Sequence, residues 1–270
     1  MKKKIGLTGS TGSLGKMILK KNKKFVFGIF KDDIRDRKKV FRWINKNNFD
    51  VVIHLAAIVP IKEVIRDPIK AKSVNLTGTK NLVDACIKKK INWFFFASTS
   101  HVYKSSNRKI SEISLKKPIS YYGKTKLSAE KYIVKRFETA KIKYCIGRIF
   151  STANKNQKKN YLVPDLKHKI KNTKKKMILK NLNHYRDFIS MEDLTSIIFI
   201  LLEKRFNGVL NLGSGNGIFL KDIAKIIAKR YKKEIIFDDN KKITYLVANI
   251  SKLLKYYKFT GSKNIENLIF

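Results

Sequence analysis

The sequence predicts an α/β protein built on a parallel, doubly wound sheet, with a smaller C-terminal lobe. Short apolar runs alternate with segments of helical periodicity, and this alternation is typical of successive right-handed βαβ units. A glycine-rich turn, Gly9 to Gly15, joins the first apolar run to the first helical segment. With 270 residues, 43% of them hydrophobic, the chain is long enough to bury a full core.

The first 150 residues supply the strands and helices of the predicted sheet in alternation. Each strand is a short apolar run, as expected of strands that are buried on both faces. Each helix places apolar side chains three and four residues apart. In chain order the predicted elements are strand 3–7, helix 14–21, strand 25–30, helix 36–47, strand 50–55, helix 71–89, strand 93–97, helix 120–139 and strand 143–149.

Beyond residue 150 the alternation loosens. The elements predicted there are strands 177–179 and 209–212 and helices 192–202 and 220–231. We therefore expect a first domain over residues 1–150 and a smaller α/β lobe over residues 151–270. The lobe would bind the substrate and return some strands and helices to the first domain.

The formal net charge of +41 is the most unusual feature of the composition. Lys accounts for 51 of the 61 basic residues, and these lysines are scattered through every segment. Protein surfaces that read nucleic-acid bases favour Arg, of which the chain has ten. We interpret the charge as a compositional bias that would attract phosphorylated substrates, and we expect no nucleic-acid partner.

Cysteine usage and the N-terminus indicate the compartment. Cys86 and Cys145 are too few for a disulfide framework. The N-terminal lysines precede a glycine-rich segment rather than the apolar run of a secretory signal. No apolar run approaches the roughly 18 residues of a membrane span. These observations predict a cytoplasmic protein with no membrane partner, and we assign no metal ligands.

Residues 8–15 contain three glycines spaced as G-x-x-G-x-x-G between a strand and a helix. Gly9 permits a tight turn, Gly12 lets the backbone approach a pyrophosphate, and Gly15 allows close packing of helix and strand. The N-terminus of the following helix offers unpaired N–H groups to an anion. The turn predicts a dinucleotide site that comprises Gly9, Ser10, Thr11, Gly12, Ser13, Leu14 and Gly15.

The end of the second predicted strand bears on the choice between NADP and NAD. Many dinucleotide folds place an acid there to bind the adenosine ribose. If Lys31 holds this position, its charge would accept a 2′-phosphate and favour NADP. If Asp32 holds it, NAD is favoured. Both alternatives stay open, with a lean toward NADP.

Tyr122 and Lys126 stand four residues apart in a predicted helix, and therefore on one face of it. A phenol titrates near a pKa of about 10, so it needs a neighbouring positive charge to lose its proton at neutral pH. The Lys126 ammonium would provide that charge, which makes Tyr122 the candidate acid and base. Thr99 follows a predicted strand at the carboxyl edge of the sheet. Its hydroxyl could hold a substrate oxygen beside Tyr122 or simply cap the loop.

With these motifs the chain resembles the extended short-chain dehydrogenase/reductase superfamily, in particular its nucleotide-sugar epimerases, dehydratases and reductases. The resemblance covers nearly the whole chain and implies a Rossmann-type fold. Besides the glycine turn, the segments that carry it are Asp33-Ile34-Arg35-Asp36, His54-Leu55-Ala56-Ala57, Asn75-Leu76-Thr77-Gly78-Thr79, Ser98-Thr99-Ser100-His101-Val102-Tyr103, Tyr122-Gly123-Lys124-Thr125-Lys126 with Glu130, Arg186-Asp187-Phe188-Ile189 and Asn211-Leu212-Gly213-Ser214-Gly215.

For the cofactor, the resemblance implies that Asp33 and Ile34 hold the adenine. Three residues that follow the third predicted strand would line the cofactor, namely Leu55, Ala56 and Ala57. The bound molecule would be NADP or NAD.

For the reaction, the resemblance implies that Thr99, Tyr122 and Lys126 form the catalytic group. Lys126 would also hold the nicotinamide ribose. Asn75 would support the active-site helix, often through water. Arg186 would face the diphosphate of a nucleotide-sugar substrate.

The chain departs from the superfamily pattern in two places. The dehydratases have an Asp-Glu pair directly after the catalytic Thr, whereas this chain has Ser100-His101, so 4,6-elimination is not expected. In epimerase-reductases resembling GDP-fucose synthase, a proton-moving cysteine stands at the position of His101. An imidazole there could move protons near neutral pH or simply line the substrate pocket together with Ser100. Ser151 stands where many relatives have an Asn that contacts the diphosphate.

The resemblance implies NAD(P)-dependent reduction or epimerisation of a 4-keto or 4-hydroxy sugar nucleotide, with Tyr122 as acid and base. An epimerase that retains its cofactor is the alternative. A non-catalytic Rossmann protein that binds RNA or a protein partner is the alternative from another class. The resemblance also implies a homodimer formed by helices 71–89 and 120–139 of each subunit, although both helices carry many lysines.

Overall fold

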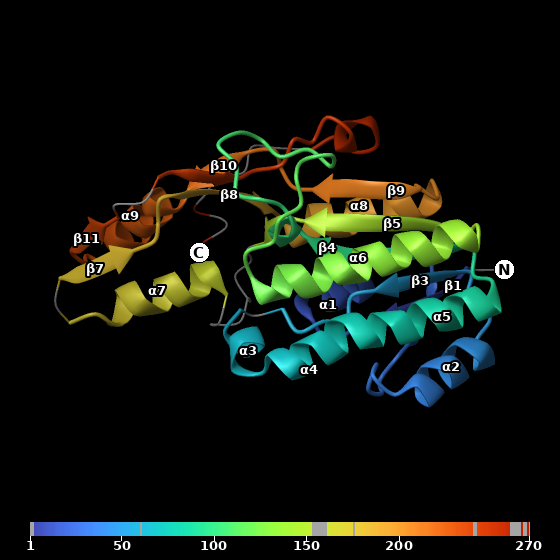
Figure 1. Cartoon of the computed structure of the whole chain (residues 1–270). Helices are drawn as coiled ribbons and strands as arrows, with labels where there is room; N and C mark the ends of the chain where they lie inside the picture. The colour runs from blue at the N-terminus through green and yellow to red at the C-terminus, as the bar shows by residue number, and fades with distance from the viewer. Residues whose placement is uncertain are drawn as a thin grey trace. The chain divides into compact units, whose positions relative to one another are not determined.

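The structure, a computed structural model, describes residues 3–59, 61–152, 161–174, 176–239 and 242–259 together with Glu266 and Ile269. The chain folds into two compact units (Figure 1). Unit 1 contains residues 1–104, 115–149 and 194–210, and unit 2 contains residues 105–114, 150–193 and 211–270. Each unit is therefore discontinuous in sequence. The domains expected over 1–150 and 151–270, and the roles given to them, stay predictions.

Unit 1 contains a six-stranded sheet with the strand order β2-β1-β3-β4-β5-β9. The pairs among its first five strands are all parallel. The chain starts at β1, moves outward to β2 and returns past β1 to β3. At such a reversal of strand order, the carboxyl ends of the strands form the crevice in which doubly wound folds bind ligands. The strands are β1 (Lys4–Thr8), β2 (Val26–Ile29), β3 (Val51–His54), β4 (Trp93–Thr99), β5 (Lys143–Ile149) and β9 (Gly208–Leu212).

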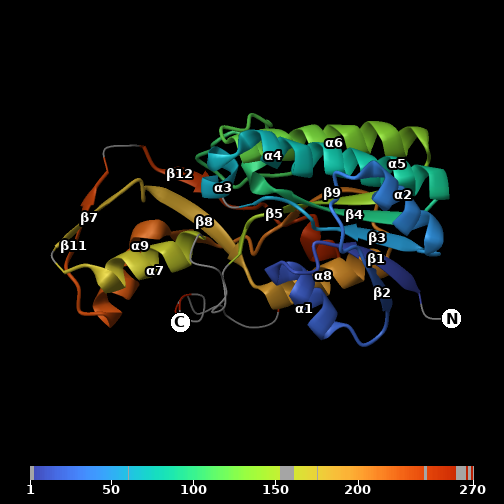
Figure 2. The same cartoon turned by 90° about the horizontal axis from the view of Figure 1, so that it is seen from below.

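Helices cover both faces of this sheet. Figure 2 shows α2, α5 and α6 on one face and α1 and α8 on the other. The four aromatic side chains Trp93–Phe96 are fully buried, as the two covered faces of β4 require. This arrangement confirms the predicted α/β class. The helices are α1 (Ser13–Lys21), α2 (Arg37–Lys46), α3 (Ile61–Arg66), α4 (Pro68–Lys72), α5 (Thr79–Lys89), α6 (Tyr121–Thr139) and α8 (Met191–Glu203), with the 3-10 helix η2 (Ser100–Val102) after β4.

The stretch predicted as a helix over 71–89 is helical throughout, but a π turn interrupts its α-helical hydrogen bonding. That stretch contains the end of α4, the π-helix η1 (Ser73–Gly78) and α5. A π turn shifts the backbone hydrogen bonds by one residue, and apolar periodicity alone does not reveal such a local shift. Single π turns inside α-helices occur frequently at functional sites, and this one contains Asn75.

Unit 2 contains a second, smaller sheet. Its central strand β8 (His184–Ile189) pairs with β10 (Gly217–Phe219), β12 (Thr244–Leu246) and β6 (Ser151–Thr152). Strand β8 was not predicted from the sequence, because its polar residues obscure the alternation of a half-buried strand. The remaining elements are α7 (Leu162–Asn172), β7 (Met177–Lys180), α9 (Leu220–Arg230), β11 (Ile235–Asp238) and the 3-10 helix η3 (Leu253–Lys255). Among the helices that the structure describes, none is long and apolar enough to cross a membrane.

Candidate active site

The glycine turn lies directly after β1, at the reversal of strand order. Gly9 has a φ of +74°, and a Cβ at this position would lie 2.6 Å from the backbone nitrogen of Ala56. A Cβ on Gly15 would overlap the carbonyl oxygen of Gly9. Gly12, at the N-cap of α1, provides no side-chain cap, so the first N–H groups of the helix stay available to an anion. The turn therefore fits a pyrophosphate.

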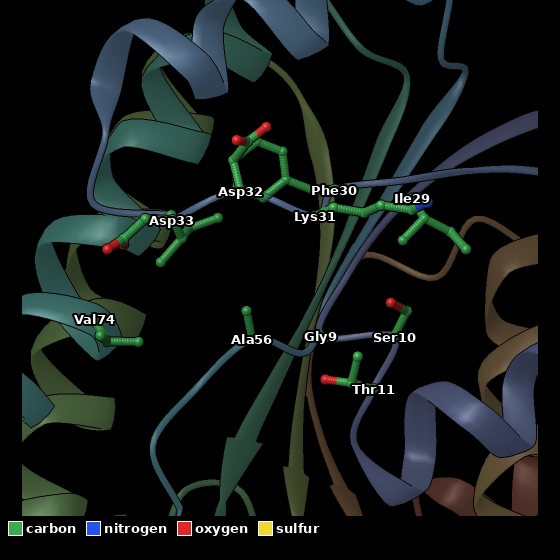
Figure 3. Close-up of a pocket in the computed structure, with 11 residues that line it drawn as sticks. Gly9, Ser10, Thr11, Ile29, Phe30, Lys31, Asp32, Asp33, Ala56 and Val74 are labelled. Atoms are coloured by element: carbon green, nitrogen blue, oxygen red, sulfur yellow. The ribbon is translucent and has the colours of Figure 1, made fainter.

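A cavity of about 570 Å³ opens beside this turn. Figure 3 shows residues that line it. Ser10 and Thr11 lie on one side of the cavity, and Asp33 and Val74 lie on the opposite side. Seven residues of the predicted cofactor set line it, namely Gly9, Ser10, Thr11, Lys31, Asp33, Ile34 and Ala56. Asp32, the alternative candidate at the end of the second strand, also lines the cavity, whereas Ile29, Phe30 and Val74 were not predicted. Ile29 and Phe30 end a predicted strand, and this position at the carboxyl edge of the sheet could have identified them as lining residues.

The two acids at the end of β2 are both paired with basic side chains. Asp32 accepts a hydrogen bond from Lys39 Nζ at 2.9 Å. Arg35 donates two hydrogen bonds to Oδ2 of Asp33, at 3.0 Å from Nε and at 2.5 Å from Nη2. The hydrogen bond from the Arg35 side chain lowers the pKa of Asp33. Lys31 is exposed, and within the described chain it makes no hydrogen bond or ion pair.

Tyr122 and Lys126 lie on the buried face of α6, with 7% and 2% of their surfaces exposed. The Lys126 ammonium lies 3.9 Å from the centroid of the Phe96 ring. Burial lowers the pKa of Lys126 to about 7, against the opposing effect of the nearby Glu130 carboxylate. Among the described residues, none forms a hydrogen bond or ion pair with the Lys126 ammonium. A buried ammonium without such a partner can donate hydrogen bonds to the hydroxyl groups of a ligand, such as those of a ribose.

Thr99 ends β4 and caps the 3-10 helix η2, because its Oγ1 accepts the N–H of His101 at 3.2 Å. The capping alternative is therefore observed, but Oγ1 is only the acceptor in this bond and its own hydrogen stays available. A Cβ on Gly123 would overlap the His101 carbonyl oxygen, so this glycine lets η2 contact α6. The rings of His101 and Tyr122 lie 6.2 Å apart, edge to face. Ser100 is 1% exposed.

Asn75 joins the π turn to the active-site helix. Its Oδ1 accepts the N–H of Ile58 at 2.8 Å, and its Nδ2 donates to the Ile58 carbonyl at 3.0 Å. The same Nδ2 lies 3.3 Å from the hydroxyl oxygen of Thr125, which donates to the Tyr122 carbonyl at 2.8 Å. Ile58 follows Leu55, Ala56 and Ala57 in the loop after β3. These bonds connect the loop after β3 to α6, and the supporting role that the resemblance implies for Asn75 stays a prediction.

Unit 2 contains the other two residues of the predicted substrate set. Ser151 lies in β6 and pairs with Phe188 of β8. The Arg186 guanidinium is half-buried, and burial lowers its pKa. Beside it, the buried Asp187 accepts hydrogen bonds from the N–H groups of Ser214, Gly215 and Ala248, an anchoring role that sequence reasoning missed.

The comparisons with known proteins cover nearly the whole chain. A family model for GDP-mannose 4,6 dehydratase matches residues 7–260. A GDP-6-deoxy-D-talose 4-dehydrogenase of Aggregatibacter actinomycetemcomitans is 28% identical over 284 residues, which cover 97% of this chain and 95% of that protein. A dTDP-D-glucose 4,6-dehydratase of Dictyostelium discoideum is 26% identical over 237 residues. That match covers 83% of this chain but only 54% of the longer relative.

Solved structures share the fold. RMD from Pseudomonas aeruginosa, complexed with NADPH, gives a TM-score of 0.85 at 20% identity and covers 99% of this chain and 96% of that chain. The UDP-glucose 4-epimerase of Thermus thermophilus, in complex with NAD, gives 0.82 at 20% identity and covers 98% and 97%. Both are cofactor complexes of nearly equal length to this chain.

The parallel sheet, its glycine turn and the buried Tyr122–Lys126 pair define a Rossmann-type enzyme of the extended short-chain dehydrogenase/reductase superfamily. Within that superfamily, the chain belongs to the GDP-mannose 4,6 dehydratase family, whose model spans almost the entire sequence. The predicted superfamily and enzyme class are confirmed.

Proposed function

We propose that this protein reduces a 4-keto sugar nucleotide, or epimerises a 4-hydroxy sugar nucleotide at C4, with NADP or NAD as its redox partner. The observation that carries the proposal is the buried Tyr122–Lys126 pair on α6, next to η2 and the end of β4. The Aggregatibacter relative supports the site of reaction, since its name is that of a sugar-nucleotide 4-dehydrogenase. A 4-dehydrogenase working in reverse reduces a 4-keto sugar.

The residues of unit 1 suit this reaction. Bound NADPH or NADH would supply the hydride. Tyr122 would donate its phenolic proton to the oxygen at C4 during reduction and accept it back in the opposite direction. Lys126 would stabilise the phenolate by its charge and hold the ribose of the cofactor. Thr99 would donate its free hydroxyl hydrogen to the same substrate oxygen.

For the cofactor we propose a preference for NADP. Both acids at the end of β2 are paired with basic side chains, so neither presents a free carboxylate to a ribose 2′-hydroxyl. Lys31 lines the same cavity, and no described residue pairs with its ammonium, which would attract a 2′-phosphate. The remaining predicted contacts belong to the proposal as well: Leu55 and Ala57 beside Ala56, and Ser13 and Leu14 at the start of α1.

For the substrate we propose that Arg186 and Ser151 contact the diphosphate, and that Ser100 and His101 face the sugar. The Ser100-His101 pair replaces the Asp-Glu pair of the dehydratases, so the proposal excludes 4,6-elimination in spite of the family name. His101 lies beside the Tyr122 ring, which places an imidazole near the proton-transfer group. It would exchange a proton at a carbon next to C4, or line the pocket.

The test is to follow the absorbance of NADPH and NADH while 4-keto sugar nucleotides are offered one at a time. We expect stoichiometric consumption of one coenzyme with at least one substrate. Tyr122→Phe is the matched variant, and it should bind the coenzyme like the wild type but turn over about 100- to 10,000-fold more slowly. Interconversion without net consumption would identify the cofactor-retaining epimerase. Salt-sensitive RNA binding without coenzyme binding would support the non-catalytic alternative.

The homodimer and the cytoplasmic location are part of the proposal. Cys86 and Cys145 are both buried and form no disulfide among the described residues, which supports a reducing compartment. The helices α5 and α6 would form the dimer interface, yet Lys80, Lys131 and Lys135 are exposed on them. Screening of these charges should favour association. We therefore expect the dimer fraction in light scattering to rise with salt, and a monomer at every salt concentration would contradict the dimer.

A further inference from the structure

A chain of buried hydrogen bonds leads from the glycine turn to the active-site helix, and His54 lies at its middle. Thr8 is the residue before Gly9, and its Oγ1 lies 2.7 Å from Nδ1 of His54. Nε2 of His54 lies 2.9 Å from Oγ1 of Thr79. The side chains of Thr8, His54 and Thr79 are at most 1% exposed. Buried polar groups need hydrogen-bond partners, and these three side chains provide them for one another.

The geometry determines the direction of each bond. The Thr79 hydroxyl donates to the carbonyl oxygen of Asn75 at 2.8 Å, because a carbonyl can only accept. Having donated its one hydrogen, Thr79 must accept from His54, so Nε2 carries the proton and Nδ1 is bare. Thr8 then donates to Nδ1, and its oxygen accepts the N–H of Ala56 at 3.3 Å. Burial lowers the pKa of His54 to about 3, so the imidazole stays neutral in this tautomer.

The far end of this chain passes through the π turn. The backbone N–H of Thr79 bonds the Leu76 carbonyl, and the Thr79 hydroxyl bonds the Asn75 carbonyl four residues earlier. The Asn75 side chain then continues to Thr125, whose hydroxyl bonds the backbone carbonyl of Tyr122.

We propose that His54 is a positioning residue, which couples the cofactor turn to the active-site helix α6 through Thr79 and Asn75. A second contact supports the coupling, because the His54 ring packs 5.6 Å from the ring of Phe96, over which the Lys126 ammonium lies. The inference rests on the proposed function, since it assumes that the turn binds the coenzyme. Ordering of the turn by the coenzyme would be transmitted through Thr8 and the imidazole to the carbonyl of Tyr122.

The test uses substitutions at Thr79 that differ by one hydroxyl. Thr79→Val removes the acceptor for His54 and the donor to Asn75, whereas Thr79→Ser keeps both. We expect Thr79→Val to lower kcat at least tenfold with less than a twofold change in the Kd for NADPH, and Thr79→Ser to stay within twofold of the wild type. Thr195→Val, at an equally buried threonine of α8, is the control for a general loss of stability.

A second measurement does not depend on turnover. In hydrogen–deuterium exchange, NADPH should protect the peptide that contains residues 121–126 in the wild type and in Thr79→Ser, but not in Thr79→Val. His54→Asn keeps an acceptor for Thr8 but cannot reach Thr79, so it should behave like Thr79→Val. Equal protection in all variants, or a loss of kcat no larger than that of Thr195→Val, would overturn the inference while the proposed function stands. Failure of the wild type to bind either coenzyme would overturn both.

Discussion

The guanidinium of Arg148 bonds both carboxylate oxygens of Glu130 in the interior of unit 1, with 3.1 Å from Nε to Oε1 and 2.7 Å from Nη2 to Oε2. Ser98 also donates to this carboxylate, and Arg148 donates to the Tyr103 hydroxyl at 2.8 Å. The ion pair therefore joins α6 to β4, β5 and the segment after η2. Of these elements, α6 contains Tyr122 and β4 contains Thr99.

Removing one partner of this ion pair should destabilise the protein strongly. Glu130→Gln leaves the Arg148 guanidinium buried without a countercharge, and we expect the free energy of unfolding to fall by about 3–5 kcal/mol. The control is Glu203→Gln, whose partner Lys24 is 71% exposed. There we expect a loss of about 0–1 kcal/mol. Urea unfolding of both variants measures the difference, and equal losses would contradict the structural role of the buried pair.

The stability of the protein should depend on pH through Lys126. Its pKa in the fold is about 7, against 10.5 for an ordinary lysine. Between these pH values the unfolded chain holds a proton that the folded chain does not, so the contribution of Lys126 to stability rises with pH across this window. Lys126→Met should remove that rise. Subtracting the free energy of unfolding of the variant from that of the wild type at each pH cancels the contributions of the other titrating groups. Parallel curves of this free energy from pH 7 to 9 would refute the prediction. The exposed Lys131→Met is the control.

Alanine at two glycines of the turn should separate folding from cofactor binding. Gly9→Ala places a Cβ at a positive φ and against Ala56, so we expect a loss of more than about 1 kcal/mol in the free energy of unfolding. A Cβ on Gly12 would meet only the Gly9 carbonyl oxygen, at 3.4 Å. Gly12→Ala should therefore keep its stability but bind NADPH at least about tenfold more weakly, or about 1.4 kcal/mol. Fluorescence titration and thermal unfolding measure the two effects, and unchanged affinity in Gly12→Ala would place the pyrophosphate elsewhere.

Lys31 should determine the choice of coenzyme. A charge-assisted hydrogen bond to a phosphate is worth about 1.5–3 kcal/mol, so Lys31→Ala should raise KM for NADPH by about 10- to 100-fold with little effect on KM for NADH. Lys38→Ala, at an exposed lysine of α2, is the control for the general loss of positive charge. If both variants change the two KM values alike, long-range attraction rather than a 2′-phosphate contact is responsible.

The sequence by itself determined the parts of this protein that depend on neighbours along the chain. The glycine turn needs only its own residues and the adjoining strand and helix. Tyr122 and Lys126 share a face because any helix places residues four apart together. The alternation of strands and helices sufficed for the parallel sheet, and so for the crevice at its carboxyl edge.

Only the tertiary structure decided which polar groups are buried and how they are paired. His54, Thr79 and Thr8 are far apart in sequence, and no periodicity predicts that they form one hydrogen-bonded chain. The lowered pKa of Lys126 likewise depends on the packing of Phe96 and the surrounding core. The π turn at Asn75 was not predicted either, because apolar periodicity does not distinguish it from an ordinary helical turn.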